Sequence, residues 1–133
     1  MSHLYLLSPS SAVLDRASLR RGIKQLEAVG HTVEVDPCAL DRDTRFAGAD
    51  ADRLAAIKRA ANSGADAVLT TRGGYGLSRL LHVLPYKAIE KSIDKGTRWV
   101  GFSDFTAFSL AVFAKTGRTS WAGPAVLEDF GAA

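Results

Sequence analysis

The chain has 133 residues, enough for one domain with its own hydrophobic core, and its composition is that of a soluble globular protein. The formal net charge of +3 is small, and both signs are scattered along the chain, so nothing points to nucleic acid as a partner. Cys38 is the single cysteine, which excludes an internal disulfide and fits a reducing compartment. The apolar run 4–7 is too short for a signal peptide or a membrane span, so we expect a cytoplasmic protein without membrane contact.

The first strand and helix are predicted near the N-terminus. Residues 3–8 form a short apolar run, and the Ser-Pro-Ser-Ser sequence at 8–11 ends it as a loop. A helix follows, because apolar residues recur at steps of three and four: Leu19, Ile23, Leu26 and Val29. Asp15 or Ser18 can cap the start of this helix, and Gly30 is placed to end it.

A second strand and helix are predicted next. Residues 32–35 alternate between apolar and polar, and the polar stretch 38–48 predicts a loop. Asp50 or Asp52 can cap a helix that runs to about Asn62. Its inward side chains are expected to be Leu54, Ile57 and Ala61.

The third strand is predicted at 67–71, and the glycine-rich turn 72–76 follows it directly. Leucines then recur at helical spacing before Pro85, and a further helical stretch covers 86–93: the leucines are Leu77, Leu80, Leu81 and Leu84.

The fourth strand is predicted at 99–102, and a helix after Ser103 ends at Gly117. Residues 119–122 predict a short fifth strand. The final stretch 126–133 shows no closing helix, and we expect that more chain follows it.

Strands that alternate with helices predict an α/β fold: a mainly parallel, doubly wound sheet of Rossmann or flavodoxin type, with helices on both faces. Ligands bind such sheets beyond the carboxyl ends of the strands. Three segments fall on that edge, the loop 8–11, the turn 72–76 and the turn at Ser103.

Ser103 stands on a turn from a buried strand to a helix, which is the geometry of a nucleophile elbow. Gly101 is the small residue two positions before it, but Phe105 occupies the position two after, where the hydrolase elbow usually has glycine. The alternative is that Ser103 is simply the N-cap of the helix.

The turn 72–76 has three glycines in four positions, so its backbone amides can approach a ligand closely. It can form an oxyanion hole, with the amide of Gly74 paired to that of Asp104, or a phosphate cradle, or only a tight turn. Arg72 is able to clamp a substrate carboxylate.

A serine nucleophile needs a base, and none is evident in the sequence. His3, His31 and His82 are far apart and show no metal-ligand spacing, so no metal is expected.

Two motifs together resemble the LD-carboxypeptidases, a family of serine peptidases that includes the microcin C self-immunity proteins. Residues 72–76 with 78–81 resemble the family's glycine-rich turn, and 101–107 resemble its Gly-x-Ser-Asp-x-Thr nucleophile segment. The resemblance extends over the whole chain, with further matches at 8–10, 45–48 and 123–124.

The resemblance implies that Ser103 is the acylated nucleophile and that the backbone amides of Gly74 and Asp104 form the oxyanion hole. The family does not restrict the position of Phe105 to glycine, which removes the objection to the elbow. We expect the substrate to contact three other residues of the turn: Arg72, Gly73 and Tyr75.

The family reaction releases the terminal D-alanine of murein tetrapeptides during cytoplasmic cell-wall recycling, without metal or cofactor, and its members are usually homodimers. The self-immunity branch instead cleaves an aminoacyl-nucleotide amide. The family's catalytic Glu and His come from a C-terminal domain. The resemblance thus implies that residues 1–133 are the nucleophile-bearing N-terminal domain and that this chain alone is nearly inactive.

Two other functions remain open from the sequence. The first is a non-catalytic α/β module that holds a nucleotide or phosphate in the glycine turn. The second is a non-catalytic interaction domain.

Overall fold

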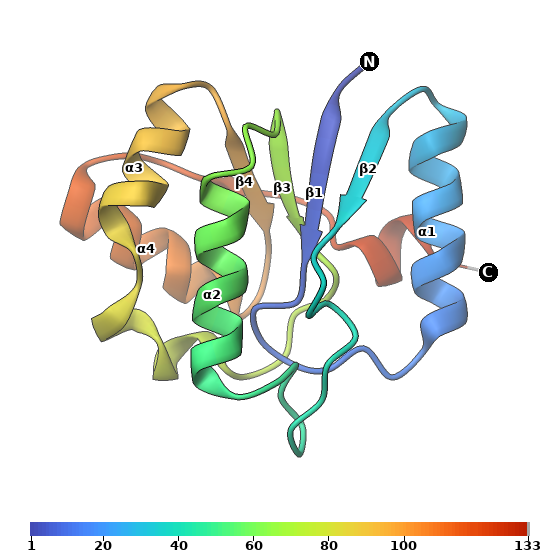
Figure 1. The fold of residues 1–133 in the computed structure, drawn as a ribbon, viewed down its shortest axis with the longest axis horizontal. Helices are drawn as coiled ribbons and strands as arrows, with labels where there is room; N and C mark the ends of the chain where they lie inside the picture. The colour runs from blue at the N-terminus through green and yellow to red at the C-terminus, as the bar shows by residue number, and fades with distance from the viewer. Residues whose placement is uncertain (133) are drawn as a thin grey trace.

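A computed structural model describes residues 1–132. At its centre is a five-stranded sheet in the order β2-β1-β3-β4-β5, in which all neighbouring strands are parallel. Helices cover both faces of this sheet (Figure 1). The predicted parallel α/β fold is confirmed.

The predicted strands all form, with boundaries close to the expected ones. The strands are β1 (His3–Leu7), β2 (Thr32–Val35), β3 (Ala67–Thr70), β4 (Arg98–Gly101) and β5 (Trp121–Ala122). The helices are α1 (Arg16–Ala28), α2 (Asp50–Ala61), α3 (Tyr86–Asp94) and α4 (Phe105–Thr116). Short 3₁₀ turns are η1 (Leu77–Arg79) and η2 (Leu81–Val83), and a π-helical turn is η3 (Val126–Phe130).

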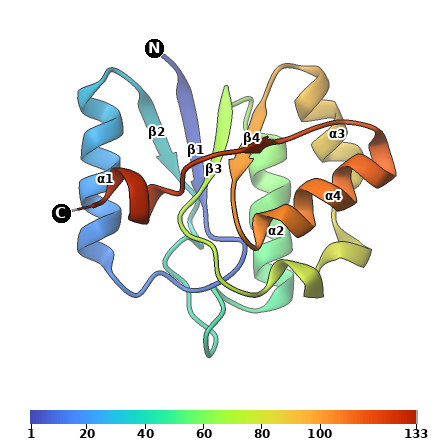
Figure 2. The same cartoon turned by 180° about the vertical axis from the view of Figure 1, so that it is seen from behind.

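The order of the strands decides which face each helix covers. From β1 the chain steps outward to β2, and from β3 to β5 it steps in the opposite direction. Because crossovers between parallel strands are right-handed, α1 lies on one face, and α2, α3 and α4 lie on the other (Figures 1 and 2). The direction reverses between β1 and β3, so the loops leaving these two strands diverge at a topological switch point.

Alternating strand side chains fill two hydrophobic cores. Leu4 and Leu6 of β1 pack towards α1 and η3, whereas Tyr5 and Leu7 pack towards the other three helices. Trp99 of β4 is 1% exposed in the second core. Its position near the start of a strand predicts a core residue, and the same position predicts one at Trp121. The prediction is confirmed for Trp99 but wrong for Trp121, because β5 is an edge strand and leaves this side chain 56% exposed.

The ends of the helices follow the predicted signals in part. Asp15 caps α1 by accepting hydrogen bonds from two backbone amides, and Gly30 ends it with a φ of +101°. The predicted capping of α2 by Asp50 or Asp52 is wrong. Ala49 occupies the N-cap without a side-chain hydrogen bond, and the Asp50 carboxylate instead binds two arginines.

The leucine-rich segment between the glycine turn and Pro85 forms η1 and η2 rather than an α-helix. Gly76, with a φ of +152°, and Pro85 bound the segment on either side, and its eight residues fold as two short 3₁₀ turns. Leu77 and Leu80 are nevertheless fully buried, so the apolar pattern marks the core correctly.

The expectation that no helical element closes the chain is also wrong. The π-helical turn η3 packs against α1 (Figure 2), where Gly22 allows close approach, since a Cβ there would lie 2.7 Å from Val126 Cγ1. The Leu127 amide donates to the Thr71 carbonyl at 3.0 Å, which ties η3 to the end of β3.

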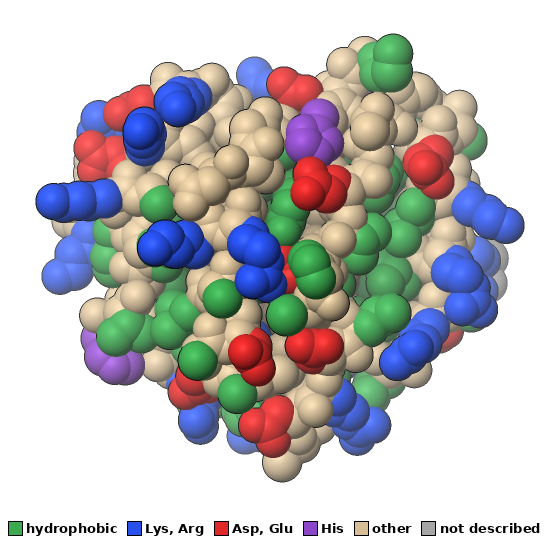
Figure 3. All heavy atoms as spheres, viewed as in Figure 1, with side chains coloured by type: hydrophobic (Ala, Val, Ile, Leu, Met, Phe, Trp, Pro, Cys, Tyr) green, Lys and Arg blue, Asp and Glu red, His purple; other side chains and the backbone are tan. Residues whose placement is uncertain are grey.

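The surface carries no dominant charge on the face in Figure 3, where basic and acidic side chains are interspersed. Within residues 1–132, every helix falls short of the length or apolarity that a membrane crossing would need.

Candidate active site

Ser103 lies on the turn between β4 and α4, at the carboxyl edge of the sheet. Its φ of +59° is in the left-handed region, which only one other non-glycine residue of the described chain, Thr44, enters. That conformation costs a non-glycine residue about 1–2 kcal/mol. The strained strand-to-helix turn exposes the serine and has the shape of a nucleophile elbow.

The alternative that Ser103 caps α4 with its side chain is wrong. The N-cap of α4 is Asp104, which has helical backbone angles and no side-chain capping bond. Ser103 instead accepts the Thr106 amide through its backbone carbonyl, at 2.9 Å. Its Oγ has no hydrogen-bond partner among residues 1–132, so it is free for other contacts.

Gly101 and Phe105 explain how the elbow is packed. A Cβ at Gly101 would lie 2.6–2.9 Å from three atoms of Phe105, so only glycine allows this aromatic residue in the first turn of α4. The Phe105 ring stacks on Phe108, with 4.7 Å between the ring centroids. The residue two after the serine is therefore a core anchor of the turn.

The glycine turn lies directly beside the elbow. A Cβ at Gly73 would lie 3.4 Å from Ser103 Cβ and 3.7 Å from Ser103 Oγ. Gly74 has a φ of +90°, and a Cβ there would lie 2.0 Å from Ser11 Oγ. The turn is thus held between the elbow and the loop after β1.

Two backbone N–H groups near Ser103 have no acceptor. Within residues 1–132, the amides of Gly74 and Asp104 donate no hydrogen bond. The Asp104 amide lies at the N-terminal end of α4, where the helix dipole favours negative charge. Both amides are therefore unused hydrogen-bond donors in the described part of the chain.

The three predicted edge segments meet at the Asp104 carboxylate. Oδ2 accepts a hydrogen bond from Ser10 Oγ at 2.7 Å and another from the Leu77 amide at 3.0 Å. One side chain therefore links the elbow, the loop after β1 and the end of the glycine turn. This placement confirms that the three segments share one edge of the sheet.

The predicted substrate contacts differ in their surroundings. Arg72 Nη1 donates to the Ala12 carbonyl at 3.2 Å, and the side chain lines a surface hollow of about 420 Å³ with Glu128. Arg72 is therefore anchored on the side of α1 and η3. Tyr75 is 44% exposed, with the Arg45 guanidinium 5.1 Å from its ring centroid.

No base stands beside Ser103 in the described part of the chain. His3 pairs with Glu34 at 2.8 Å, a partner the sequence did not indicate, and His31 Nδ1 accepts the Ser2 amide. Both histidines lie at the amino ends of β1 and β2, the edge opposite to Ser103. His82, on η2, forms no hydrogen bond within residues 1–132.

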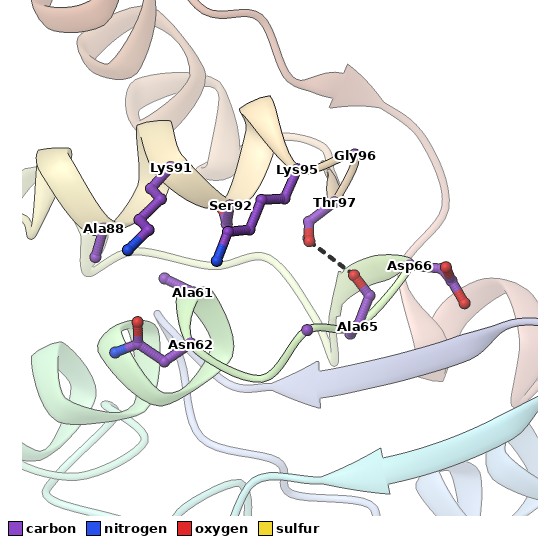
Figure 4. A pocket seen from close by; sticks show the side chains of 11 residues that line it. Ala61, Asn62, Ala65, Asp66, Ala88, Lys91, Ser92, Lys95, Gly96 and Thr97 are labelled. Carbon is purple, nitrogen blue, oxygen red and sulfur yellow. Dashed lines mark hydrogen bonds between the residues drawn. The ribbon is translucent and has the colours of Figure 1, made fainter.

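Figure 4 shows a surface hollow lined by residues from the amino ends of β3 and β4, whereas Ser103 follows the carboxyl end of β4. It measures about 310 Å³ and adjoins the amino ends of β3 and β4, between α2 and α3. Its buried hydroxyls are already used, since Ser92 donates to the Ile89 carbonyl and Thr97 to the Ala65 carbonyl. The elbow, rather than this hollow, is the candidate active site.

Arg53 is the residue near the site that the sequence analysis missed. Its side chain is fully buried, and Nη1 donates to the carbonyls of Pro9 at 2.9 Å and Gly76 at 3.0 Å. Burial lowers the pKa of Arg53, and the Asp50 carboxylate opposes that shift. A signal was present, because Arg53 precedes Ile57 by one helical turn on the buried face of α2.

Fold and site together define an α/β domain with a serine on a strained strand-to-helix turn and a glycine turn packed beside it. Residues 4–123 match the model of the LD-carboxypeptidase N-terminal domain. The chain therefore belongs to the LD-carboxypeptidase family.

Relatives support this assignment. A Streptomyces coelicolor protein provisionally named a carboxypeptidase is 36% identical over 123 residues, covering 90% of this chain and 39% of that protein. The solved muramoyltetrapeptide carboxypeptidase of Oxalobacter formigenes has 36% identity and a TM-score of 0.85, covering 98% of this chain and 43% of that one. The microcin C7 self-immunity protein of Escherichia coli is 38% identical over 64 residues, which cover 48% of this chain and 18% of that protein. The chain spans about two fifths of the length of the Streptomyces coelicolor and Oxalobacter formigenes relatives.

Proposed function

We propose that this chain supplies the nucleophile and the oxyanion-binding amides of a serine hydrolase that cleaves an LD-amide bond. The observation that carries the proposal is the strained Ser103 turn, whose serine lies against Gly73 of the glycine turn. A backbone held in the left-handed region by packing is typical of functional positions. The unbonded Gly74 and Asp104 amides add the donors that acyl transfer needs.

The proposed reaction has two steps. Ser103 Oγ attacks the amide carbonyl, its proton passes to a base, and the Gly74 and Asp104 amides stabilise the oxyanion. The base then protonates the leaving amine as the carbon–nitrogen bond breaks, and water hydrolyses the acyl-enzyme. We propose that Glu and His residues of a C-terminal domain supply and orient this base.

The substrate we propose is a murein tetrapeptide, from which the enzyme releases the terminal D-alanine. Support comes from the Oxalobacter formigenes relative, whose name states a muramoyltetrapeptide carboxypeptidase. This reaction belongs to cell-wall recycling, so we propose that the protein acts in the cytoplasm. We also propose that the full-length chain works as a homodimer.

A second candidate substrate is an aminoacyl-nucleotide amide. The observation that favours it is the likeness to a solved microcin C7 self-immunity protein in complex with aspartyl sulfamoyl adenosine, with 25% identity and a TM-score of 0.90. The same serine and amides would perform the chemistry, so the two candidates differ only in what the rest of the site recognises.

The test measures D-alanine release from murein tetrapeptide by this chain and by the full-length protein that contains it. Ser103→Ala should lower release by the full-length protein at least about 10⁴-fold. The matched control is Ser2→Ala, at the opposite edge of the sheet, which should leave release unchanged. Undiminished release by the Ser103→Ala variant would refute the proposal, whereas cleavage of only the aminoacyl-nucleotide amide would select the second substrate.

A further inference from the structure

Two charged side chains hold one peptide group from both of its polar ends. The Gly76 carbonyl accepts a hydrogen bond from Arg53 Nη1 at 3.0 Å. The amide of the next residue, Leu77, donates to Asp104 Oδ2 at 3.0 Å. The peptide group at the end of the glycine turn therefore cannot rotate without breaking a hydrogen bond to a charged group at each end.

The same two side chains also hold the loop after β1. The Pro9 carbonyl accepts from Arg53 Nη1 at 2.9 Å, and Ser10 Oγ donates to Asp104 Oδ2 at 2.7 Å. Hydrogen bonds to charged groups are about twice as strong as neutral ones. Arg53 and Asp104 thus fix two loops against the elbow, although no hydrogen bond joins them directly.

Several further contacts hold the Arg53 side chain in place. Its side chain is fully buried, Nε donates to the Gly48 carbonyl at 3.3 Å, and the guanidinium lies 4.9 Å from the centroid of the Phe46 ring. A Cβ at Gly76 would lie 2.8 Å from Nη1, so the last glycine of the turn makes room for this cation. A buried cation surrounded by loop carbonyls acts as a rigid brace.

We propose that the Asp104 carboxylate and the Arg53 guanidinium are positioning residues, which hold the glycine turn so that the Gly74 amide faces the acyl oxygen on Ser103. This inference rests on the proposed function of Ser103. Asp104 then has two separate roles, because its amide binds the oxyanion and its carboxylate anchors the loop that carries the other amide. A displacement of about 1 Å at a reacting centre costs about 10²-fold in rate.

The experiment measures kcat and KM for D-alanine release by the full-length protein. Each kcat is divided by the number of sites that a fluorophosphonate labels at completion, which removes any loss due to unfolded protein. Asp104→Asn keeps the shape of the side chain but not its charge, and it should lower kcat per site about 10²-fold with little change in KM. Arg53→Lys should act in the same direction. Asp66→Asn, at the amino end of β3, is the matched control and should change neither.

A double-mutant cycle supplies the second readout. Ser10→Ala removes one of the two hydrogen bonds to the Asp104 carboxylate, so its effect should largely disappear in the Asp104→Asn background. An unchanged kcat per site in Asp104→Asn, or a change confined to KM, would overturn the positioning role of Asp104. The proposed function would still stand in that case, provided that Ser103→Ala is inactive. Activity in Ser103→Ala would instead overturn the proposed function itself.

Discussion

Replacing Gly74 by alanine tests whether the glycine turn packs as closely as the structure shows. Gly74 has a φ of +90°, and an added Cβ would lie 2.0 Å from Ser11 Oγ and 2.6 Å from Ser11 Cβ. The left-handed backbone costs alanine about 1–2 kcal/mol. Relieving the overlap costs about 1–3 kcal/mol more, because Ser11 or the turn must move. We expect Gly74→Ala to lower the free energy of unfolding by about 2–5 kcal/mol in total.

Gly96 provides a matched control for the backbone part of this cost. Its φ is +105°, but an added Cβ would have no atom within 4 Å. Gly96→Ala should therefore cost only about 1–2 kcal/mol. Urea unfolding of this chain measures both variants, and the difference between them isolates the overlap with Ser11.

The overlap can also be removed from the other side. Ser11→Gly deletes the two atoms that would lie closer than 3 Å to the new Cβ, so in the Gly74→Ala background it should recover most of the stability lost to the overlap. In the full-length protein, Gly74→Ala should lower kcat about 10²-fold by displacing the proposed oxyanion donor, and Gly96→Ala should not. Equal destabilisation by the two alanines, or no recovery with Ser11→Gly, would refute this account of the turn.

Two further predictions concern strain and charge. Ser103→Gly should abolish hydrolysis but raise the free energy of unfolding by about 1 kcal/mol, because glycine tolerates the φ of +59°. Urea unfolding measures this free energy, and a destabilised variant would mean that the turn is not strained. Burial raises the pKa of Asp36, but hydrogen bonds from Arg59, Tyr5 and the Cys38 amide outweigh it and hold that pKa below its ordinary value. Its contribution to stability is therefore present above the unfolded-state pKa and is lost as pH falls through the folded-state pKa. Arg59→Ala should cost about 3 kcal/mol and move acid unfolding to higher pH, as followed by circular dichroism; an unchanged acid midpoint would contradict it.

Local signals in the sequence were sufficient for the order of the elements. Gly30 and Gly117 end α1 and α4 as predicted, because a left-handed residue at a helix end strongly favours glycine. The two motifs were predicted to meet because they follow strands that a βαβ connection makes neighbours, and β3 and β4 are indeed paired.

Tertiary contacts decided what the sequence did not reveal. The helical spacing places Arg53 on the buried face of α2, but only the carbonyls of Pro9 and Gly76, from two other loops, make burial of its charge favourable. Asp50 looks like an N-cap, but two arginines compete for its carboxylate. Trp121 looks like a core residue, but it lies on an edge strand with no neighbour on its far side within the described chain.

The turn at Ser103 and the hydrogen bonds of Asp104 and Arg53 around it are formed within residues 1–132. The same residues place no base beside Ser103 Oγ. Preorganised amides stabilise an oxyanion whatever group removes the serine proton, but an unassisted hydroxyl is a weak nucleophile. The two requirements are therefore separable. Variants of Asp104 and Arg53 should change the rate per labelled site, whereas addition of the base should change whether Ser103 reacts at all. A fluorophosphonate should therefore label Ser103 quickly in the full-length protein and slowly in this chain. If the two contributions are independent, Asp104→Asn should slow labelling of both proteins by the same factor.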